Sequence, residues 1–133
     1  MLKKKPKIKE VSITKLRKKA WDLQSKYIRQ KEGGICFTCK KRDDWKNQQA
    51  GHFVHGHNMD FVEENIHCQC PRCNKWLNGN LILYAINLER KYGPGIIQKL
   101  KRKGDKIKRY KVSELQAIID KNKKLIEKYK GRE

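Results

Sequence analysis

The sequence predicts an α+β protein that is mainly helical, with a small stranded centre between two helical flanks. Apolar residues recur at helical spacing near both ends of the 133-residue chain. Residues 35–80, in contrast, hold all five cysteines, all four histidines and two of the three tryptophans. The chain is 36% charged and only 37% hydrophobic, so it has little apolar surface to bury. Small domains of this kind often need a metal or a disulfide to hold them together.

The first expected element is a basic, Pro-containing flexible arm over residues 1–11. A helix is expected to follow from Ser12 or Thr14 and to end at the glycine pair Gly33-Gly34. Its apolar stripe recurs every three or four residues and consists of Leu16, Ala20, Leu23 and Tyr27.

Two short strands are expected in the centre, over residues 48–54 and 65–69, with a polar loop at 55–64 between them. The next helix is expected from Lys75 or Leu81 onward and ends where Gly-Pro-Gly interrupts the pattern at 93–95. Its predicted inner face consists of Leu81, Tyr84, Ala85 and Leu88.

Two further helices are expected toward the C-terminus, a basic one over 96–102 and a longer one over 113–130. Ser113 and Gln116 have the spacing of a capping box. The apolar stripe of the last helix could pack on the first helix or on a second copy of the chain. These elements divide the chain into a core with its leading helix, 12–95, and a basic helical extension, 96–133.

The charge balance indicates a polyanionic partner. The chain has 34 Lys and Arg against 14 Asp and Glu, a formal net charge of +20. Neutralising phosphates releases condensed counterions, so nucleic acid is the expected partner. A membrane is not expected, because no run of eighteen apolar residues occurs. The densest basic run, 99–111, is interpreted as a phosphate-binding loop, with a solvated linker as the alternative.

The cysteine spacing predicts a structural zinc site. Cys36 and Cys39 form one Cys-x-x-Cys unit, and Cys70 and Cys73 form another. The basic N-terminus has no apolar segment after it, so a cytoplasmic protein is expected, in which such units bind metal rather than form disulfides. Four thiolates complete a closed tetrahedral zinc site. The fifth cysteine, Cys68, could substitute as a ligand, but a small buried thiol is the favoured interpretation.

The residues between and after these units carry a resemblance to a known family. His52 lies on the first expected strand, Asn65 and His67 lie near the second, and Asn74 follows Cys73 directly. This order resembles that of HNH nucleases, which have a ββα-metal core. The runs GHF and NIHCQCPRCNKWLNGN are most similar to the NinG (Rap) family of lambdoid phages, described as recombination endonucleases that act on branched DNA. The similarity covers about residues 16–100, and phage endonuclease VII is similar more distantly.

The resemblance implies roles for three of these residues. His52 would be the general base that takes a proton from water, since imidazole titrates near neutral pH. Asn74 would help hold a catalytic cation, Mg²⁺ or Mn²⁺, at the scissile phosphate. Asn65 would pin the loop through hydrogen bonds from its side chain to the backbone.

One position departs from the HNH pattern. Many HNH nucleases have a metal-binding Asp directly before the catalytic His, and this chain has Gly51 there. A further cation ligand is therefore expected, with His67 and His57 favoured over Asp60 and over His55, which is interpreted as a polar loop residue. A histidine-rich site would shift the preference toward Mn²⁺, Ni²⁺ or Zn²⁺.

Basic residues near this expected site would contact DNA phosphates rather than read bases. No helix has the side-chain mix expected of major-groove readout, so binding is predicted to select DNA structure rather than sequence. Trp76 could stack on a base, but a core position is the favoured interpretation. The expected phosphate contacts are Arg17, Arg29, Arg72, Lys75, Lys101, Arg102, Lys103 and Arg109.

The function expected from these features is that of a metal-dependent endonuclease acting on branched recombination intermediates such as Holliday junctions and D-loops. A homodimer and recombination proteins are expected partners by analogy, in the cytoplasm of the host cell if a phage encodes the chain. The alternatives are a zinc-stapled DNA-binding module without catalysis and a sequence-tolerant HNH nicking enzyme.

Overall fold

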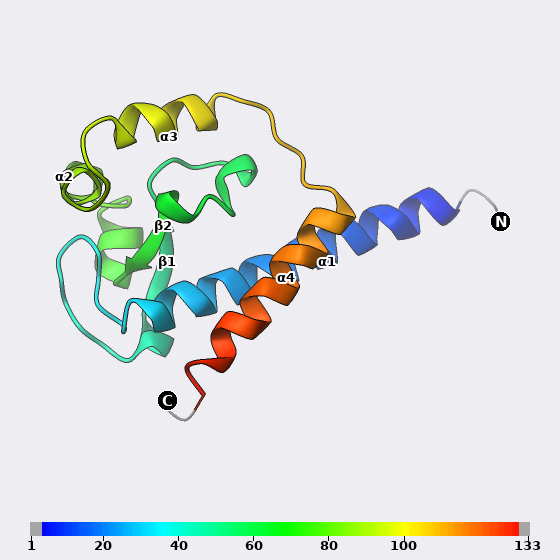
Figure 1. Ribbon diagram of the computed structural model, residues 1–133, viewed down its shortest axis with the longest axis horizontal. Coiled ribbons are helices and arrows are strands. Elements are labelled where there is room, and N and C mark those ends of the chain that lie inside the picture. Colours follow the sequence, from blue (N-terminus) through cyan, green and yellow to red (C-terminus); the bar gives the residue numbers. More distant parts are fainter. Residues whose placement is uncertain (1–3, 131–133) are drawn as a thin grey trace.

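The computed structural model describes the backbone of residues 4–130 and the side chains of residues 12–130. In Figure 1 a long helix and the last helix cross each other on one side of a two-stranded ribbon, and two shorter helices lie on the other side. The helices are α1 (Lys4–Lys31), α2 (Leu81–Tyr92), α3 (Ile96–Gly104) and α4 (Val112–Glu127), and the strands are β1 (Gln49–His52) and β2 (Ile66–Gln69).

Helix α1 begins earlier than the sequence predicted. It starts at Lys4 rather than at Ser12 or Thr14, so most of the expected arm has a helical backbone, and residues 1–3 of that arm lie outside the described residues. Pro6 falls in the first turn, where a helix needs no N–H donor, and therefore does not prevent the early start. The predicted end is confirmed, because Gly33 and Gly34 both have positive φ.

Helices α1 and α4 bury one apolar cluster between them. Ala20, Leu115 and Ile119 are at most 1% exposed, and Leu16 and Leu23 pack against them. Beside this cluster the Asn122 Nδ2 donates to the Gln24 Oε1 at 2.9 Å. The stripe of the last helix is thus covered by the first helix of the same chain, which is one of the two alternatives that the sequence left open.

The start of α4 differs from the predicted capping box. The helix begins at Val112, and Glu114 rather than Gln116 reaches back, its Oε1 accepting from the Lys111 N–H at 2.9 Å. The Lys108 Nζ also donates to Glu114, at 2.7 Å. A lysine side chain has no acceptor, so only one half of a capping box can form here.

The two strands expected in the centre are present, and β1 pairs antiparallel with β2, with Gly51 opposite His67 and Gln49 opposite Gln69. Since side chains alternate along a strand, these four residues belong to one face and His52 belongs to the other. The face of His52 is directed toward α1, whose Trp21 ring stacks on the His52 ring at 4.9 Å.

A second apolar core lies between the ribbon, α2 and α3. The predicted inner face of α2 is confirmed for Tyr84 and Leu88, which are fully buried with Phe37, Met59 and Leu100 around them. Leu81 is instead 42% exposed, because it is the first residue of α2 and covers the preceding turn at Gly79. Between residues 4 and 130, every helix is too short or too polar to cross a bilayer.

Candidate functional site

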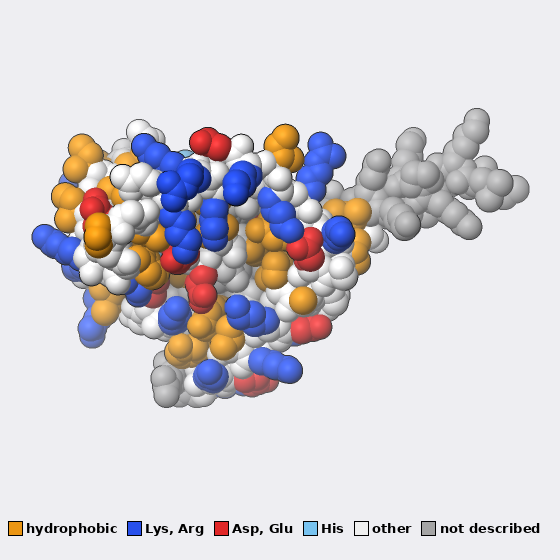
Figure 2. All heavy atoms as spheres, turned by 45° about the horizontal axis from the view of Figure 1, so that its top comes forward, with side chains coloured by type: hydrophobic (Ala, Val, Ile, Leu, Met, Phe, Trp, Pro, Cys, Tyr) orange, Lys and Arg blue, Asp and Glu red, His pale blue; other side chains and the backbone are white. Residues whose placement is uncertain are grey.

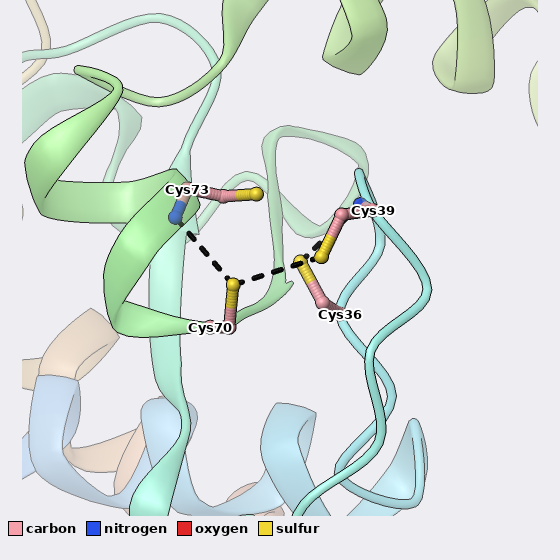
Figure 3. Close-up of side chains that lie close together, drawn as sticks. All are labelled: Cys36, Cys39, Cys70 and Cys73. Atoms are coloured by element: carbon pink, nitrogen blue, oxygen red, sulfur yellow. Dashed lines mark hydrogen bonds between the residues drawn. The ribbon is translucent and has the colours of Figure 1, made fainter.

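The four predicted cysteines form one cluster, in which all four sulfur atoms lie within 4.8 Å of one another (Figure 3). The Cys39 Sγ lies 3.7 Å from the Cys70 Sγ, a contact that joins the two Cys-x-x-Cys units. Tetrahedral zinc with Zn–S bonds of about 2.3 Å separates its sulfur ligands by about 3.8 Å. The cluster therefore has the size and the donor set of a four-thiolate zinc site.

The backbone of each unit turns toward its first sulfur. The Cys39 N–H faces the Cys36 Sγ and the Cys73 N–H faces the Cys70 Sγ, both at 3.5 Å. Burial raises the pKa of Cys36, but hydrogen bonds from Thr38 and nearby backbone N–H groups outweigh it and lower this pKa to about 6. Burial raises the pKa of Cys39 to about 12. A bound cation would ionise all four thiols, because metal ligation requires the thiolate form of cysteine.

Cys68 lies outside this cluster, as the favoured interpretation predicted. It is fully buried, and burial together with the nearby Glu32 raises the pKa of its thiol to about 12. Its backbone N–H donates to the Glu32 Oε1 at 2.8 Å. The fifth cysteine is therefore a neutral thiol of the core.

His52 is paired with a carboxylate. Its Nε2 lies 2.9 Å from the Asp60 Oδ1, and the two side chains are only 17% and 14% exposed. Because a carboxylate accepts hydrogen bonds, the Nε2 carries the proton of this bond, and in the neutral imidazole the Nδ1 keeps a lone pair. The stacked Trp21 ring holds the imidazole plane. The pair has the arrangement of a histidine base oriented by an acid.

Asp60 belongs to the loop between the strands, and the two residues before it anchor this loop to the rest of the molecule. Met59 is fully buried in the second core, and the Asn58 Nδ2 donates to the carbonyls of Gly104 and Lys106 at 3.1 and 2.8 Å. Asn58 was missed by sequence reasoning, since its partners are more than forty positions away and leave no local pattern.

The four histidines divide into two groups. His57 is 83% exposed and its Nδ1 lies 3.2 Å from the Asp60 Oδ2, while the exposed His55 lies with its ring 5.8 Å from that of His52. His67 is buried, with its Nδ1 2.6 Å from the Glu32 Oε2 and its Nε2 3.2 Å from the Tyr92 hydroxyl. Both ring nitrogens of His67 are engaged, so neither is free for the cation that the sequence assigned to it.

Asn65 makes the contacts that were predicted for it. Its Oδ1 accepts from the Val54 N–H at 2.8 Å, and its Nδ2 donates to the Val54 carbonyl at 2.9 Å. The Tyr84 hydroxyl donates to the Gly51 carbonyl at 2.8 Å from the other side. The backbone on both sides of His52 is therefore fixed.

Asn74 lies in the short helical turn η4 (Arg72–Trp76) that follows the second cysteine unit. Its Nδ2 donates to the Gln49 Oε1 at 2.7 Å, and its Oδ1 is directed to Gly51. Gly51 and Gln49 belong to the ribbon face opposite to that of His52. The two predicted catalytic residues therefore flank the end of β1 from opposite faces, with separate sets of contacts.

The basic residues of α3 and of the segment after it form an exposed surface. Figure 2 shows lysine and arginine side chains gathered along this side of the molecule, with a few acidic side chains among them. We call this surface the basic face; the predicted phosphate contacts on it are Lys101, Arg102, Lys103 and Arg109. Arg72 and Lys75 are exposed on η4, and Arg17 is half-buried on α1.

Arg29 has an internal use instead of the predicted phosphate contact. Its guanidinium donates to the carbonyls of Ser25, Trp45 and Gln48 at 3.1 to 3.4 Å and lies over the Trp45 ring. Burial lowers the pKa of Arg29. This side chain ties α1 to the start of β1.

The core interpretation of Trp76 is wrong, because its side chain is 80% exposed. The turn η4 has only five residues and presents Trp76 on its outer side, next to the exposed Lys75. Leu77, Ile82 and Ile86 are exposed in the same part of the chain. Trp76 is thus an exposed aromatic ring with basic neighbours, three residues after Cys73 of the four-cysteine cluster.

Comparison with known proteins gives one match. The family model described as Bacteriophage Lambda NinG protein matches residues 1–132. No curated protein and no solved structure matches the chain.

Proposed function

Because the chain belongs to the bacteriophage lambda NinG family, we propose that it is a metal-dependent DNA endonuclease of the HNH type. The order strand, strand, helical turn over residues 49–76 supports an HNH core. The four-cysteine cluster supports a structural zinc that joins the segment before β1 to the turn after β2. Such a zinc would also fix Asn74, the residue next to Cys73.

The observation that carries the proposal is the 2.9 Å pair of His52 and Asp60. With its Nε2–H held by the carboxylate, His52 would accept a proton at Nδ1 from a water molecule. That water would form a new bond to phosphorus, while the bond from phosphorus to the leaving sugar oxygen breaks. A divalent cation, Mg²⁺ or Mn²⁺, would supply charge neutralisation at the phosphate when bound.

The position of the basic face supports DNA as the substrate. Asn58 joins the loop that carries Asp60 to the end of α3, so the positive charge and the His52–Asp60 pair are parts of one unit. Phosphates attracted to Lys101, Arg102 and Lys103 would be delivered next to His52. Contacts to phosphates carry no sequence information, which favours selection of branched intermediates such as Holliday junctions and D-loops by shape.

The exposed Trp76 supports the same substrate class, because an aromatic ring can stack on the unpaired bases near a branch. By family analogy alone, we further propose that the protein acts in the host cytoplasm alongside recombination proteins. The same analogy suggests a homodimer that cuts two strands.

A second candidate is a zinc-stapled DNA-binding module without catalysis. It is favoured by the lack of a carboxylate at Gly51 and by the separate contacts of His52 and Asn74. Within residues 12–130, the cysteine cluster is the one group of three or more His, Cys, Asp or Glu side chains whose ligand atoms lie close enough to hold an ion. A sequence-tolerant nicking enzyme is a third candidate.

The deciding experiment is cleavage of supercoiled plasmid and of a four-way junction in Mg²⁺ and in Mn²⁺. We expect His52→Ala to reduce cleavage by at least about 100-fold, the usual contribution of a general base. His55→Ala is the matched control: this exposed histidine of the same loop lies over the His52 ring at 5.8 Å but takes no part in the hydrogen bonds of Asp60, so its variant should cut far better than His52→Ala. If the wild type leaves both DNAs intact in both ions, the nuclease proposal is wrong and the binding module is supported. If the wild type cuts linear duplex faster than the junction, the nicking enzyme is supported.

A further inference from the structure

Gln69 carries a buried carboxamide whose two ends have different environments. The residue is fully buried on β2, and its Nε2 donates to the Gly79 carbonyl at 2.9 Å and to the Thr38 hydroxyl at 3.2 Å. A backbone carbonyl only accepts, so the nitrogen must be the atom on that side. The Oε1 therefore points the other way, where it is buried without any hydrogen-bond partner.

An unsatisfied buried oxygen is costly, which makes its surroundings informative. The Gln69 Oε1 occupies the place where Gly51 would carry a Cβ, so any larger residue at position 51 would collide with it. The Asn74 Oδ1 lies 2.9 Å from the same point. Two carboxamide oxygens, from β2 and from η4, are thus directed to the backbone of the residue before His52.

This is the position from which many HNH nucleases supply a carboxylate to their cation. We propose that Gln69 replaces it, and that the Gln69 Oε1 and the Asn74 Oδ1 together hold the divalent cation. This inference rests on the proposed function. It explains why position 51 is a glycine, because the ligand arrives from the neighbouring strand and fills the space of a side chain there.

The donor chemistry sets the choice of cation. Both ligands are hard oxygen donors, which Mg²⁺ and Mn²⁺ prefer, and no imidazole takes part. Neighbouring oxygen ligands of Mg²⁺ stand about 3 to 4 Å apart at bond lengths near 2.1 Å, which suits two oxygens directed to one point. Two neutral ligands bind a cation weakly, so water and phosphate oxygens of the DNA complete the coordination.

The test measures Mn²⁺ binding to the zinc-loaded full-length protein, from the electron paramagnetic resonance signal of free Mn²⁺. Gln69→Ala should weaken Mn²⁺ binding at least tenfold, with zinc content and circular dichroism unchanged. Asn87→Ala is the matched control, because this buried carboxamide also braces the cysteine segment, donating to the carbonyls of Phe37 and Thr38, but has no contact with Gly51. It should bind Mn²⁺ like the wild type.

A second pair of variants keeps the proposal falsifiable if Gln69→Ala does not fold. Gln69→Glu retains the length of the side chain and adds a charge, so it should tighten Mn²⁺ binding about tenfold. In Gly51→Asp/Gln69→Ala the removed carboxamide leaves room for a carboxylate from β1, which should restore Mn²⁺ binding to the wild-type level or above. Wild-type Mn²⁺ affinity in folded Gln69→Ala, or unchanged affinity in Gln69→Glu, overturns the assignment.

The nuclease proposal and the cation site fail in different ways. His52→Ala should abolish cleavage and leave Mn²⁺ binding intact, because His52 is not among the two ligands. A wild type that binds Mn²⁺ through Gln69 but never cuts DNA refutes the nuclease and supports the site. A wild type that cuts DNA while Gln69→Ala binds Mn²⁺ and cuts equally well refutes the site alone.

Discussion

The side-chain amide of Asn58 donates a hydrogen bond of 2.8 Å to the backbone carbonyl of Lys106, 48 positions further along the chain. Two more carbonyls at the end of α3, those of Lys103 and Gly104, lie within reach of the same nitrogen. The last carbonyls of a helix have no partner within it, so Asn58 serves as their cap. One side chain therefore couples the loop of Asp60 to the basic face.

Replacing Asn58 should loosen both the loop of Asp60 and the end of α3. Asn58→Ala is expected to destabilise the fold by about 1 to 2 kcal/mol, the range for losing a partly buried hydrogen-bonding group. Thermal unfolding measures the loss, and cleavage should fall with it because Asp60 is less well held. Asn47→Ala is the control, an exposed asparagine that contacts only Asp43, and it should unfold at the wild-type temperature.

Removal of the predicted zinc should unfold the centre of the molecule. Binding of zinc to four thiolates contributes on the order of 10 kcal/mol, as large as the whole stability of a domain. Metal analysis should find one zinc per chain, and chelation or Cys70→Ser should remove it together with much of the ordered structure. Cys68→Ala should keep the zinc, since Cys68 lies outside the cluster. A well-folded preparation without zinc contradicts this prediction.

The basic face should dominate the salt dependence of DNA binding. The triple variant Lys101→Ala/Arg102→Ala/Lys103→Ala should lower the slope of log affinity against log salt by about 2 to 3, close to one per lost phosphate contact. A titration of labelled junction DNA between low and high salt measures it. The control removes three exposed lysines of α4, Lys121, Lys123 and Lys124, and so has the same net charge. Equal slopes for both triple variants would show that net charge alone acts.

Trp76 should matter for branched DNA more than for duplex. Stacking of an aromatic ring on an unpaired base contributes about 1 to 3 kcal/mol, so Trp76→Ala should weaken junction binding by about 5- to 100-fold. Binding to a fully paired duplex of the same length should change less than twofold. Trp76→Phe should retain most of the preference. Equal losses on both DNA forms would mean that Trp76 is not a contact for unpaired bases.

Sequence patterns predicted the helices, the end of α1 and the cysteine cluster, because these features depend on residues close together in the sequence. The apolar periods near the two ends of the chain predicted the stripes that α1 and α4 bury between them, at Ala20, Leu115 and Ile119. The Cys-x-x-Cys spacing predicted the four-cysteine cluster. The glycine pair after α1 predicted where that helix ends.

The features that sequence reasoning missed depend on partners far along the chain. His67 looked like a ligand because the sequence does not show that Glu32, 35 positions earlier, accepts from its ring. The sequence also did not show that Asp60 pairs with His52, because Asp60 was considered only as a cation ligand. No sequence pattern pointed to Gln69 as a site residue. The lack of a partner for its Oε1 is visible only once β1, β2 and η4 are placed together.

The contact between Gln24 and Asn122 also bears on how the chain is made. These residues are 98 positions apart, so α1 leaves the ribosome long before the helix that covers it. At about 5 to 20 residues per second, the stripe of α1 lacks its partner helix α4 for about 5 to 20 seconds of translation. During that interval Leu16 and Leu23 have only the earlier parts of their cluster, such as Phe61, to cover them, and are more open to chaperones and proteases of the cell. Fast synthesis of residues 24–122 should therefore raise the yield of folded protein.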